Sequence, residues 1–79
     1  MSPTVFRYKG YRFYFFSREE ERMHVHVYYA DGEAKFWIEP CISLAKNWGL
    51  SDSQVTELMK VAKEHRDEIA EAWRNHFRS

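Results

Sequence analysis

The chain has 79 residues, of which 44% are hydrophobic and 30% are charged. These values fit one small globular domain over residues 1–79 and exclude a disordered chain. The formal net charge is zero, so no overall basic field points to nucleic acid. The lone cysteine, Cys41, rules out an intrachain disulfide, and no segment has the apolar length of a membrane span or signal peptide. We therefore expect a cytoplasmic protein.

The first two predicted strands form a hairpin. Thr4–Tyr8 and Tyr11–Ser17 are rich in aromatic residues and flank Lys9-Gly10. A two-residue turn there requires Lys9 to adopt a positive φ, which is unfavourable for a residue with a Cβ atom. The charged segment Arg18–Arg22 then predicts a loop.

The next two predicted strands are His24–Tyr29 and Ala34–Ile38, joined by a turn at Asp31-Gly32 and ended by Pro40. This turn would place Val27 opposite Phe36 on an apolar face. On the other face it pairs Tyr28 with Lys35, His26 with Trp37, and His24 with Glu39.

A long helix is predicted after the strands. Residues 41–50 give no clear pattern beyond a short helical turn at Leu44–Asn47. Ser51 and Gln54 have the spacing of a capping box, and apolar residues then recur at helical spacing to about residue 77. The expected fold is α+β, a four-stranded antiparallel meander with one C-terminal helix packed on one face.

The sheet face away from the helix is the candidate binding surface. It combines rings, imidazoles and cations, and exposed patches of this kind mark interaction sites. The predicted members of this surface are Arg7, Arg12, Tyr14, His24, His26, Tyr28, Lys35, Trp37 and Glu39.

Four interpretations of this surface stay open at this point. It can dock a protein partner in a homo- or hetero-oligomer, or it can bind RNA by stacking and phosphate contacts. The imidazoles of His24 and His26 can act as an acid–base pair on a phosphodiester, which makes them the candidate catalytic residues. They can also ligate a metal together with Glu39, but this set falls short of the usual four zinc ligands, so no metal or other cofactor is predicted.

Two further residues have structural interpretations. His65 falls on the apolar stripe of the predicted helix, where a partly buried histidine bonded to the sheet is expected. Cys41 has no histidine placed beside it, so a structural role is expected rather than a catalytic one.

The chain resembles a small prokaryotic family, domain of unknown function four-one-six-zero. The segments that carry the likeness are PTVFRYKGYRFYFFS, HVHV, GEAKFWIEP, LAKNWGLS and EHRDEIAEAWRNHF, which follow one another over almost the whole chain. One departure precedes the histidines, where Arg22 and Met23 replace the family's two prolines.

The resemblance implies a component of a toxin–antitoxin-like module, with this family as the toxin. The implied partner is a short protein of family two-four-four-two. From this resemblance together with the predicted sheet face, we expect the chain to bind that partner and, when free, RNA or the translation machinery. A non-catalytic protein-binding module and a histidine- or metal-dependent ribonuclease are the alternatives. The resemblance supplies no catalytic residues, so whether the protein is an enzyme is left open.

Overall fold

A single antiparallel sheet and two helices make up the computed structural model, which describes residues 4–15, 22–30 and 32–77. The strand order is β1-β2-β3-β4-β5, so every strand pairs with its neighbours in sequence. The elements are β1 (Thr4–Tyr8), β2 (Tyr11–Tyr14), β3 (His24–Tyr29), β4 (Gly32–Trp37), β5 (Ser43–Trp48), α1 (Asp52–Glu64) and α2 (Arg66–Phe77).

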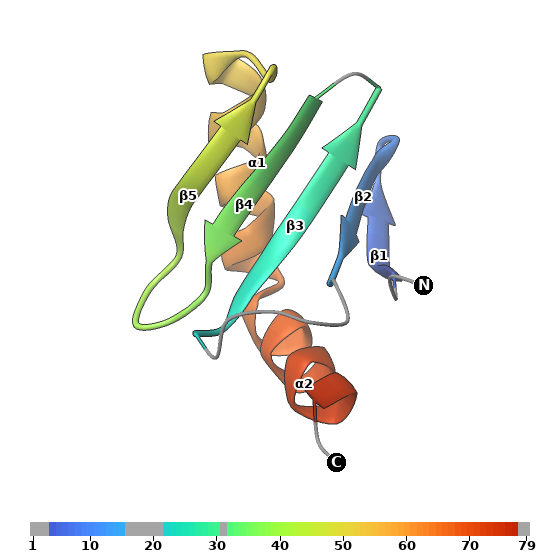
Figure 1. Ribbon diagram of the computed structural model, residues 1–79, viewed down its shortest axis with the longest axis vertical. Helices are drawn as coiled ribbons and strands as arrows, with labels where there is room; N and C mark the ends of the chain where they lie inside the picture. Colours follow the sequence, from blue (N-terminus) through green and yellow to red (C-terminus); the bar gives the residue numbers. More distant parts are fainter. Residues whose placement is uncertain (1–3, 16–21, 31, 78–79) are drawn as a thin grey trace.

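Figure 1 shows α1 behind the sheet and α2 at its lower end, near the start of β3. The predicted α+β class and antiparallel meander are confirmed, but the sheet has five strands and the helical region is divided in two. The predicted loop over residues 18–21 and the end of the second predicted strand, residues 16–17, lie outside the described residues. Among the described helices, none has the length and apolar character needed to cross a membrane.

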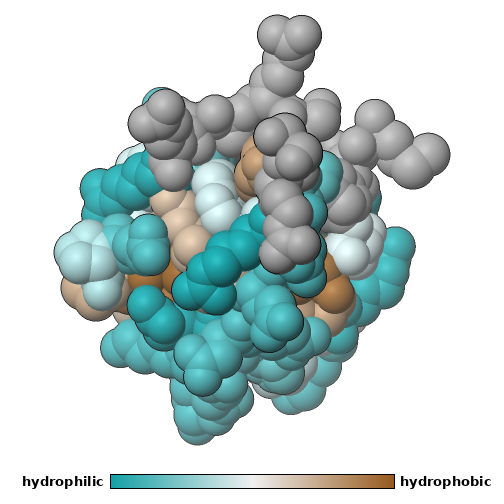
Figure 2. Space-filling model, turned by 90° about the horizontal axis from the view of Figure 1, so that it is seen from below, coloured by the Kyte–Doolittle hydropathy of each residue, from teal (hydrophilic) through white to brown (hydrophobic). Residues whose placement is uncertain are grey.

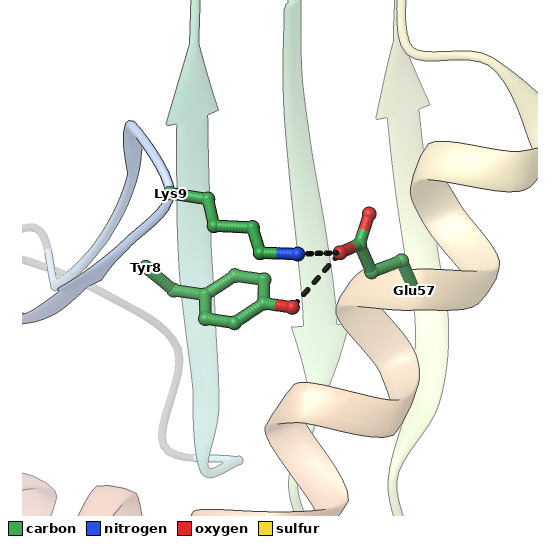
Figure 3. Close-up of polar contacts among 3 residues, drawn as sticks. All are labelled: Tyr8, Lys9 and Glu57. Carbon is green, nitrogen blue, oxygen red and sulfur yellow. Dashed lines mark hydrogen bonds and ion pairs between the residues drawn. The ribbon is translucent and has the colours of Figure 1, made fainter.

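The first hairpin has the predicted turn. Lys9 and Gly10 both adopt positive φ, 47° and 84°, and Arg7 pairs with Arg12 as the turn requires. A β-bulge between Thr4 and Phe6 then adds one residue to β1. The turn with its positive φ at Lys9 is fastened to α1 by two contacts. Lys9 Nζ lies 3.6 Å from Glu57 Oε2, and Tyr8 donates a 2.8 Å hydrogen bond to the same oxygen (Figure 3).

The predicted register of the second hairpin is wrong by two residues. Tyr29 pairs with Gly32, so the connection lies at positions 30 and 31, of which position 31 is outside the described residues. Ala30 has the positive φ of 47°. Gly32 is the first residue of β4, and a Cβ atom at this position would lie 2.5 Å from Leu50 Cδ2, so the close approach of Leu50 requires a glycine there. A shift of two residues keeps each side chain on its predicted face, but it pairs His24 with Trp37 and His26 with Lys35.

The helical turn predicted at Leu44–Asn47 is wrong, because these residues belong to β5. Its pairing with β4 outweighs the helix propensity of Leu, Ala and Lys. Lys46 pairs with Lys35 and Leu44 pairs with Phe36, so a bulge at Ala45 interrupts the alternation of β5. That interruption removes the period of two by which the sequence could have revealed the strand.

The predicted single helix is two helices. The capping box is present: Gln54 N–H donates to Ser51 Oγ, and Ser51 N–H donates to Gln54 Oε1. α1 ends at Glu64, and His65 departs from helical geometry at φ −109° and ψ 19° before α2 begins. The His65 ring lies 4.5 Å from the ring of Phe6 in β1, so the chain changes direction where it contacts the sheet.

The core fills the space between the sheet and the helices. From the strands it takes alternate side chains such as Phe13, Val25 and Phe36, and from the helices it takes Leu58 and Ile69. Trp73 of α2 packs edge-on against Phe15, with ring centroids 5.4 Å apart. Seen from the α2 end, the surface is mostly hydrophilic, with only small separate hydrophobic areas (Figure 2).

Candidate functional site

The face of the sheet opposite α1 is called the outer face here, and it is turned towards the viewer in Figure 1. Strand alternation and the observed register show which side chains of β1 to β5 lie on this face, and they are again rings, imidazoles and cations. Its members are Arg7, Arg12, Tyr14, His24, His26, Tyr28, Glu33, Lys35, Trp37, Ser43, Lys46 and Trp48.

His24 is at the end of this face that meets α2. Its ring lies 5.7 Å from Trp37 and 5.0 Å from Trp73, both in edge-on arrangements, and the residue is 1% exposed. Its Nδ1 atom is 2.7 Å from the carbonyl oxygen of Arg22. A carbonyl only accepts, so Nδ1 of His24 carries a proton, and the ring is fixed in that tautomer whenever it is neutral.

His26 belongs to a polar cluster in the middle of the face. Tyr14 donates a 2.6 Å hydrogen bond to Glu33 Oε2, and Nδ1 of His26 lies 3.6 Å from the same oxygen. The Tyr14 and His26 rings are stacked with centroids 5.4 Å apart. One carboxylate oxygen is therefore shared between a phenol and an imidazole contributed by adjacent strands.

The exposure predicted for the two histidines is wrong. His24 and His26 are together on the outer face, with ring centroids 5.2 Å apart, but they are 1% and 5% exposed. Trp73 covers His24 from α2, and Tyr14 stacks on His26 from β2. The alternation of a strand shows which face a side chain takes, but it cannot show what a neighbouring element places over that face.

Cations lie over the rings of this face. The Arg22 guanidinium carbon is 4.1 Å from the centroid of Trp37, and Lys35 Nζ is 4.6 Å from the same centroid. Arg12 lies 4.7 Å from the Tyr14 ring. Such contacts position each cation beside an apolar surface and reduce its hydration. The indole of Trp37 is consequently covered by charge rather than open for stacking.

The remaining predicted members divide by exposure. Arg7 and Tyr28 are exposed, Arg12 and Lys35 are half-buried, and Tyr14 is buried. Glu39 lies beyond the end of β4, so it does not pair with His24 as predicted; its carbonyl oxygen accepts a 2.9 Å hydrogen bond from Arg22 Nε. The contact between Arg22 and Glu39 therefore closes one end of the outer face, whereas the other end, around Tyr28, is exposed.

Sequence reasoning missed four members of the outer face, Glu33, Ser43, Lys46 and Trp48, and it also missed Arg22 beside them. Lys46 and Trp48 are on β5, which was not predicted, and Lys46 lies 5.7 Å from the Trp48 ring. Glu33 was missed because the predicted strand began only at Ala34, and it pairs with Tyr28 on one side and Trp48 on the other. Arg22 precedes β3, and no sequence signal places it over Trp37.

The other candidates have simple surroundings. His65 contacts the sheet through its ring rather than by a hydrogen bond to a strand, and its Nδ1 is 2.9 Å from Glu68 Oε1 on α2. Cys41 is exposed between β4 and β5. Within residues 4–15, 22–30 and 32–77, no three His, Cys, Asp or Glu side chains gather closely enough to hold a metal ion.

A family profile described as "Domain of unknown function (DUF4160)" matches residues 10–74, which include most of the outer face. The chain belongs to this family. The match confirms the resemblance seen in the sequence, and it extends from the first hairpin turn to the last turns of α2. No curated protein and no solved structure gives a significant match.

Proposed function

We propose that this DUF4160 chain is the toxin of a toxin–antitoxin-type module and binds RNA or the translation machinery through its outer face. Its antidote is a small partner protein of family two-four-four-two. The proposal rests on one observation, the concentration of positive charge on the outer face of a chain whose net charge is zero. Among the strand residues that the structure describes, that face carries Arg7, Arg12, Lys35 and Lys46, with Arg22 over Trp37, against one carboxylate, that of Glu33.

The two helices, α1 behind the sheet and α2 at its lower end, have the reverse balance. α1 and α2 together carry six carboxylates and four Lys or Arg residues. A polyanion approaching the molecule is therefore attracted to the sheet and not to the helices. An acidic partner protein attracted by the same field would cover the surface that binds the target, which is a direct means of neutralisation.

Binding accounts for this surface better than acid–base catalysis does. A general acid or base has to reach the proton that it transfers, directly or through one water. His24 and His26 are 1% and 5% exposed and lie under neighbouring rings. The cations and half-exposed rings around them are accessible, so contact with a target does not require the buried imidazoles.

Induced expression of the full chain in a bacterial host tests the proposal. We expect growth to stop on induction and to recover when the partner protein is expressed together with it. Arg7 and Lys46 are exposed on the outer face, so the double variant R7E/K46E should abolish arrest while the fold is kept.

The matched control is K60E/K63E, which makes the same change of charge at exposed positions of α1. This variant should still arrest growth and still be rescued. Unimpaired growth on expression of the folded wild type would overturn the toxin assignment and favour a non-catalytic protein-binding module. Equal toxicity of R7E/K46E and the wild type would overturn the role of the outer face.

A further inference from the structure

The outer face contains two pairs of like charges on adjacent strands. Arg7 pairs directly with Arg12 across β1 and β2, and Lys35 pairs directly with Lys46 across β4 and β5. Cations in opposite positions on one face of a sheet repel each other and destabilise it. A bound polyanion would place negative charge beside both pairs. The two pairs lie on the two sides of β3, so such a ligand would cross the sheet.

Two aromatic side chains of the same face, one on β3 and one on β5, are half exposed. Tyr28 is 49% exposed and Trp48 is 48% exposed, whereas Trp37 is covered by Arg22 and Lys35. Flat, exposed rings beside cations are the combination with which proteins bind single-stranded nucleic acid, because bases stack on the rings while cations contact phosphates. The carboxylates of an acidic peptide would contact the cations but would not stack on the rings.

The register sets the distance between the two rings. Tyr28 pairs with Glu33, and Glu33 pairs with Trp48, so the rings lie two strands apart in one row across the sheet. Adjacent strands are separated by about 4.8 Å, which puts their backbones about 10 Å apart. Glu33 lies between them and would repel a phosphate, so the phosphates should follow Lys35 and Lys46 in the next row.

From these observations we infer that the outer face binds single-stranded nucleic acid. Bases stack on Tyr28 and Trp48, and phosphates are contacted by Arg12, Lys35 and Lys46. This inference rests on the proposed function, and it names the class of ligand and the part of the face that takes it. The row from Arg12 to Trp48 has the dimensions of a short site, on the order of four nucleotides. His24 and His26 belong to the same face but are 1% and 5% exposed, so they are not expected to contact the ligand.

Fluorescence anisotropy with the purified full chain and fluorescein-labelled octamers tests this inference. Single-stranded RNA, single-stranded DNA and a blunt RNA duplex of the same sequence are compared. Either single strand should bind more tightly than the duplex, because paired bases are not available to the rings. Y28A and W48A should each weaken binding about fivefold to a hundredfold, while Y28F and W48F should retain most of it.

Leu44→Ala is the matched control, because Leu44 is also exposed on β5 but pairs with Phe36 of the core face. It should leave the affinity unchanged. Lys46→Gln should reduce the slope of log affinity against log salt by about 0.7, the value for one phosphate contact on a single strand. Circular dichroism of each variant ensures that only folded proteins are compared.

Three results would overturn the inference. The first is equal affinity for the duplex and the single strands, which would indicate electrostatic attraction alone. The second is unchanged affinity in both Y28A and W48A. The third is equally tight binding of poly-glutamate that is insensitive to Y28A, which would indicate an acidic protein partner. Growth arrest that persists in Y28A/W48A would count against this site while leaving the proposed toxin role standing.

Discussion

At the scale of single residues, the shared oxygen of Glu33 is the feature that organises the middle of the outer face. Tyr14 is 5% exposed and donates to this oxygen at 2.6 Å. Tyr14→Phe keeps the ring and removes the donor, so the variant leaves the carboxylate with one partner fewer. We expect a loss of about 1–3 kcal/mol in the free energy of unfolding, the usual range for a hydrogen bond to a charged group.

Urea denaturation followed by circular dichroism measures this loss. Tyr28→Phe is the control, because Tyr28 is half exposed on the adjacent strand and its hydroxyl can bond to water. It should unfold within about 0.5 kcal/mol of the wild type. Equal stability of Tyr14→Phe and Tyr28→Phe would show that the bond to Glu33 contributes nothing measurable.

Tyr11 gives the protein a pH dependence in the alkaline range. Burial is the largest effect on this phenol and raises its pKa above the ordinary value of 10.0. The folded protein therefore holds the proton more tightly than the unfolded chain. The stabilisation is fully present below pH 10 and is lost as the pH rises through the pKa of the folded state.

The urea midpoint of the wild type, measured at constant salt, should accordingly fall as the pH is raised from 10 through the pKa of the folded state. Tyr11→Phe has no phenol to ionise, so its midpoint should fall less steeply over the same interval. A parallel fall in the two proteins would assign the pH dependence to other groups.

Gly32 illustrates a residue whose importance depends on a close approach. A Cβ atom at this position would lie 2.5 Å from Leu50 Cδ2 and 3.2 Å from the carbonyl carbon of Gly49. Gly32→Ala should therefore destabilise the protein by about 1–3 kcal/mol, as overpacking does. In the double variant with Leu50→Ala, the effect of Gly32→Ala should shrink, and a thermal-denaturation cycle of the four proteins measures that coupling. Strict additivity would contradict the contact.

At the scale of secondary-structure elements, the start of α1 is the part that sequence and structure describe alike. Ser51 and Gln54 exchange the two hydrogen bonds of a capping box. Ser51→Ala should destabilise the protein by about 1 kcal/mol, measured as a lowered urea midpoint at an unchanged slope. Thr56→Ala, at an exposed position one turn further along α1, is the control and should change the midpoint little. A midpoint for Ser51→Ala equal to that of the control would contradict a stabilising cap.

Local signals predicted the elements whose causes are local. The hairpin turn at Lys9-Gly10, the capping box and the face taken by each strand residue all follow from short-range geometry. The errors have long-range causes. β5 forms because β4 offers it a partner, β4 begins at Gly32 where Leu50 packs closely on the strand, and the helix is divided where His65 contacts Phe6.

The candidate site was predicted in part for the same reason. Alternation placed His24, His26 and Trp37 together, but the burial of His24 depends on Trp73, which is almost fifty residues away in sequence, and that of His26 depends on Tyr14 of another strand. Lys46 and Trp48 could not be added without knowledge of the fifth strand. A pattern within one strand cannot encode what a distant helix covers.

At the scale of the whole molecule, Trp73 joins α2 to the sheet. Its ring contacts Phe15, His24 and Phe77, with centroids 5.4, 5.0 and 4.2 Å away. Trp73→Ala should remove about 3–5 kcal/mol of stability, which is a large part of the total for a domain of this size. Thermal denaturation should show a strongly lowered midpoint, and hydrogen exchange should show lost protection in α2.

Arg74→Ala is the matched control for this variant, because Arg74 is the next residue of α2 and is exposed. It should unfold close to the wild type. If Trp73→Ala lowered the midpoint no more than Arg74→Ala, the packing of α2 against the sheet would contribute little to stability.

The bulges in β1 and β5 affect how readily two copies of the sheet can associate edge to edge at high concentration. These two are the outermost strands of the sheet, and each carries one extra residue that breaks its row of backbone donors and acceptors. A second chain adding at either edge would meet an irregular row of backbone donors and acceptors, and at β5 it would also meet the ammonium group of Lys46. The bulges therefore disfavour the growth of fibrils by addition of strands, although no further described strand covers either edge of this aromatic-rich sheet.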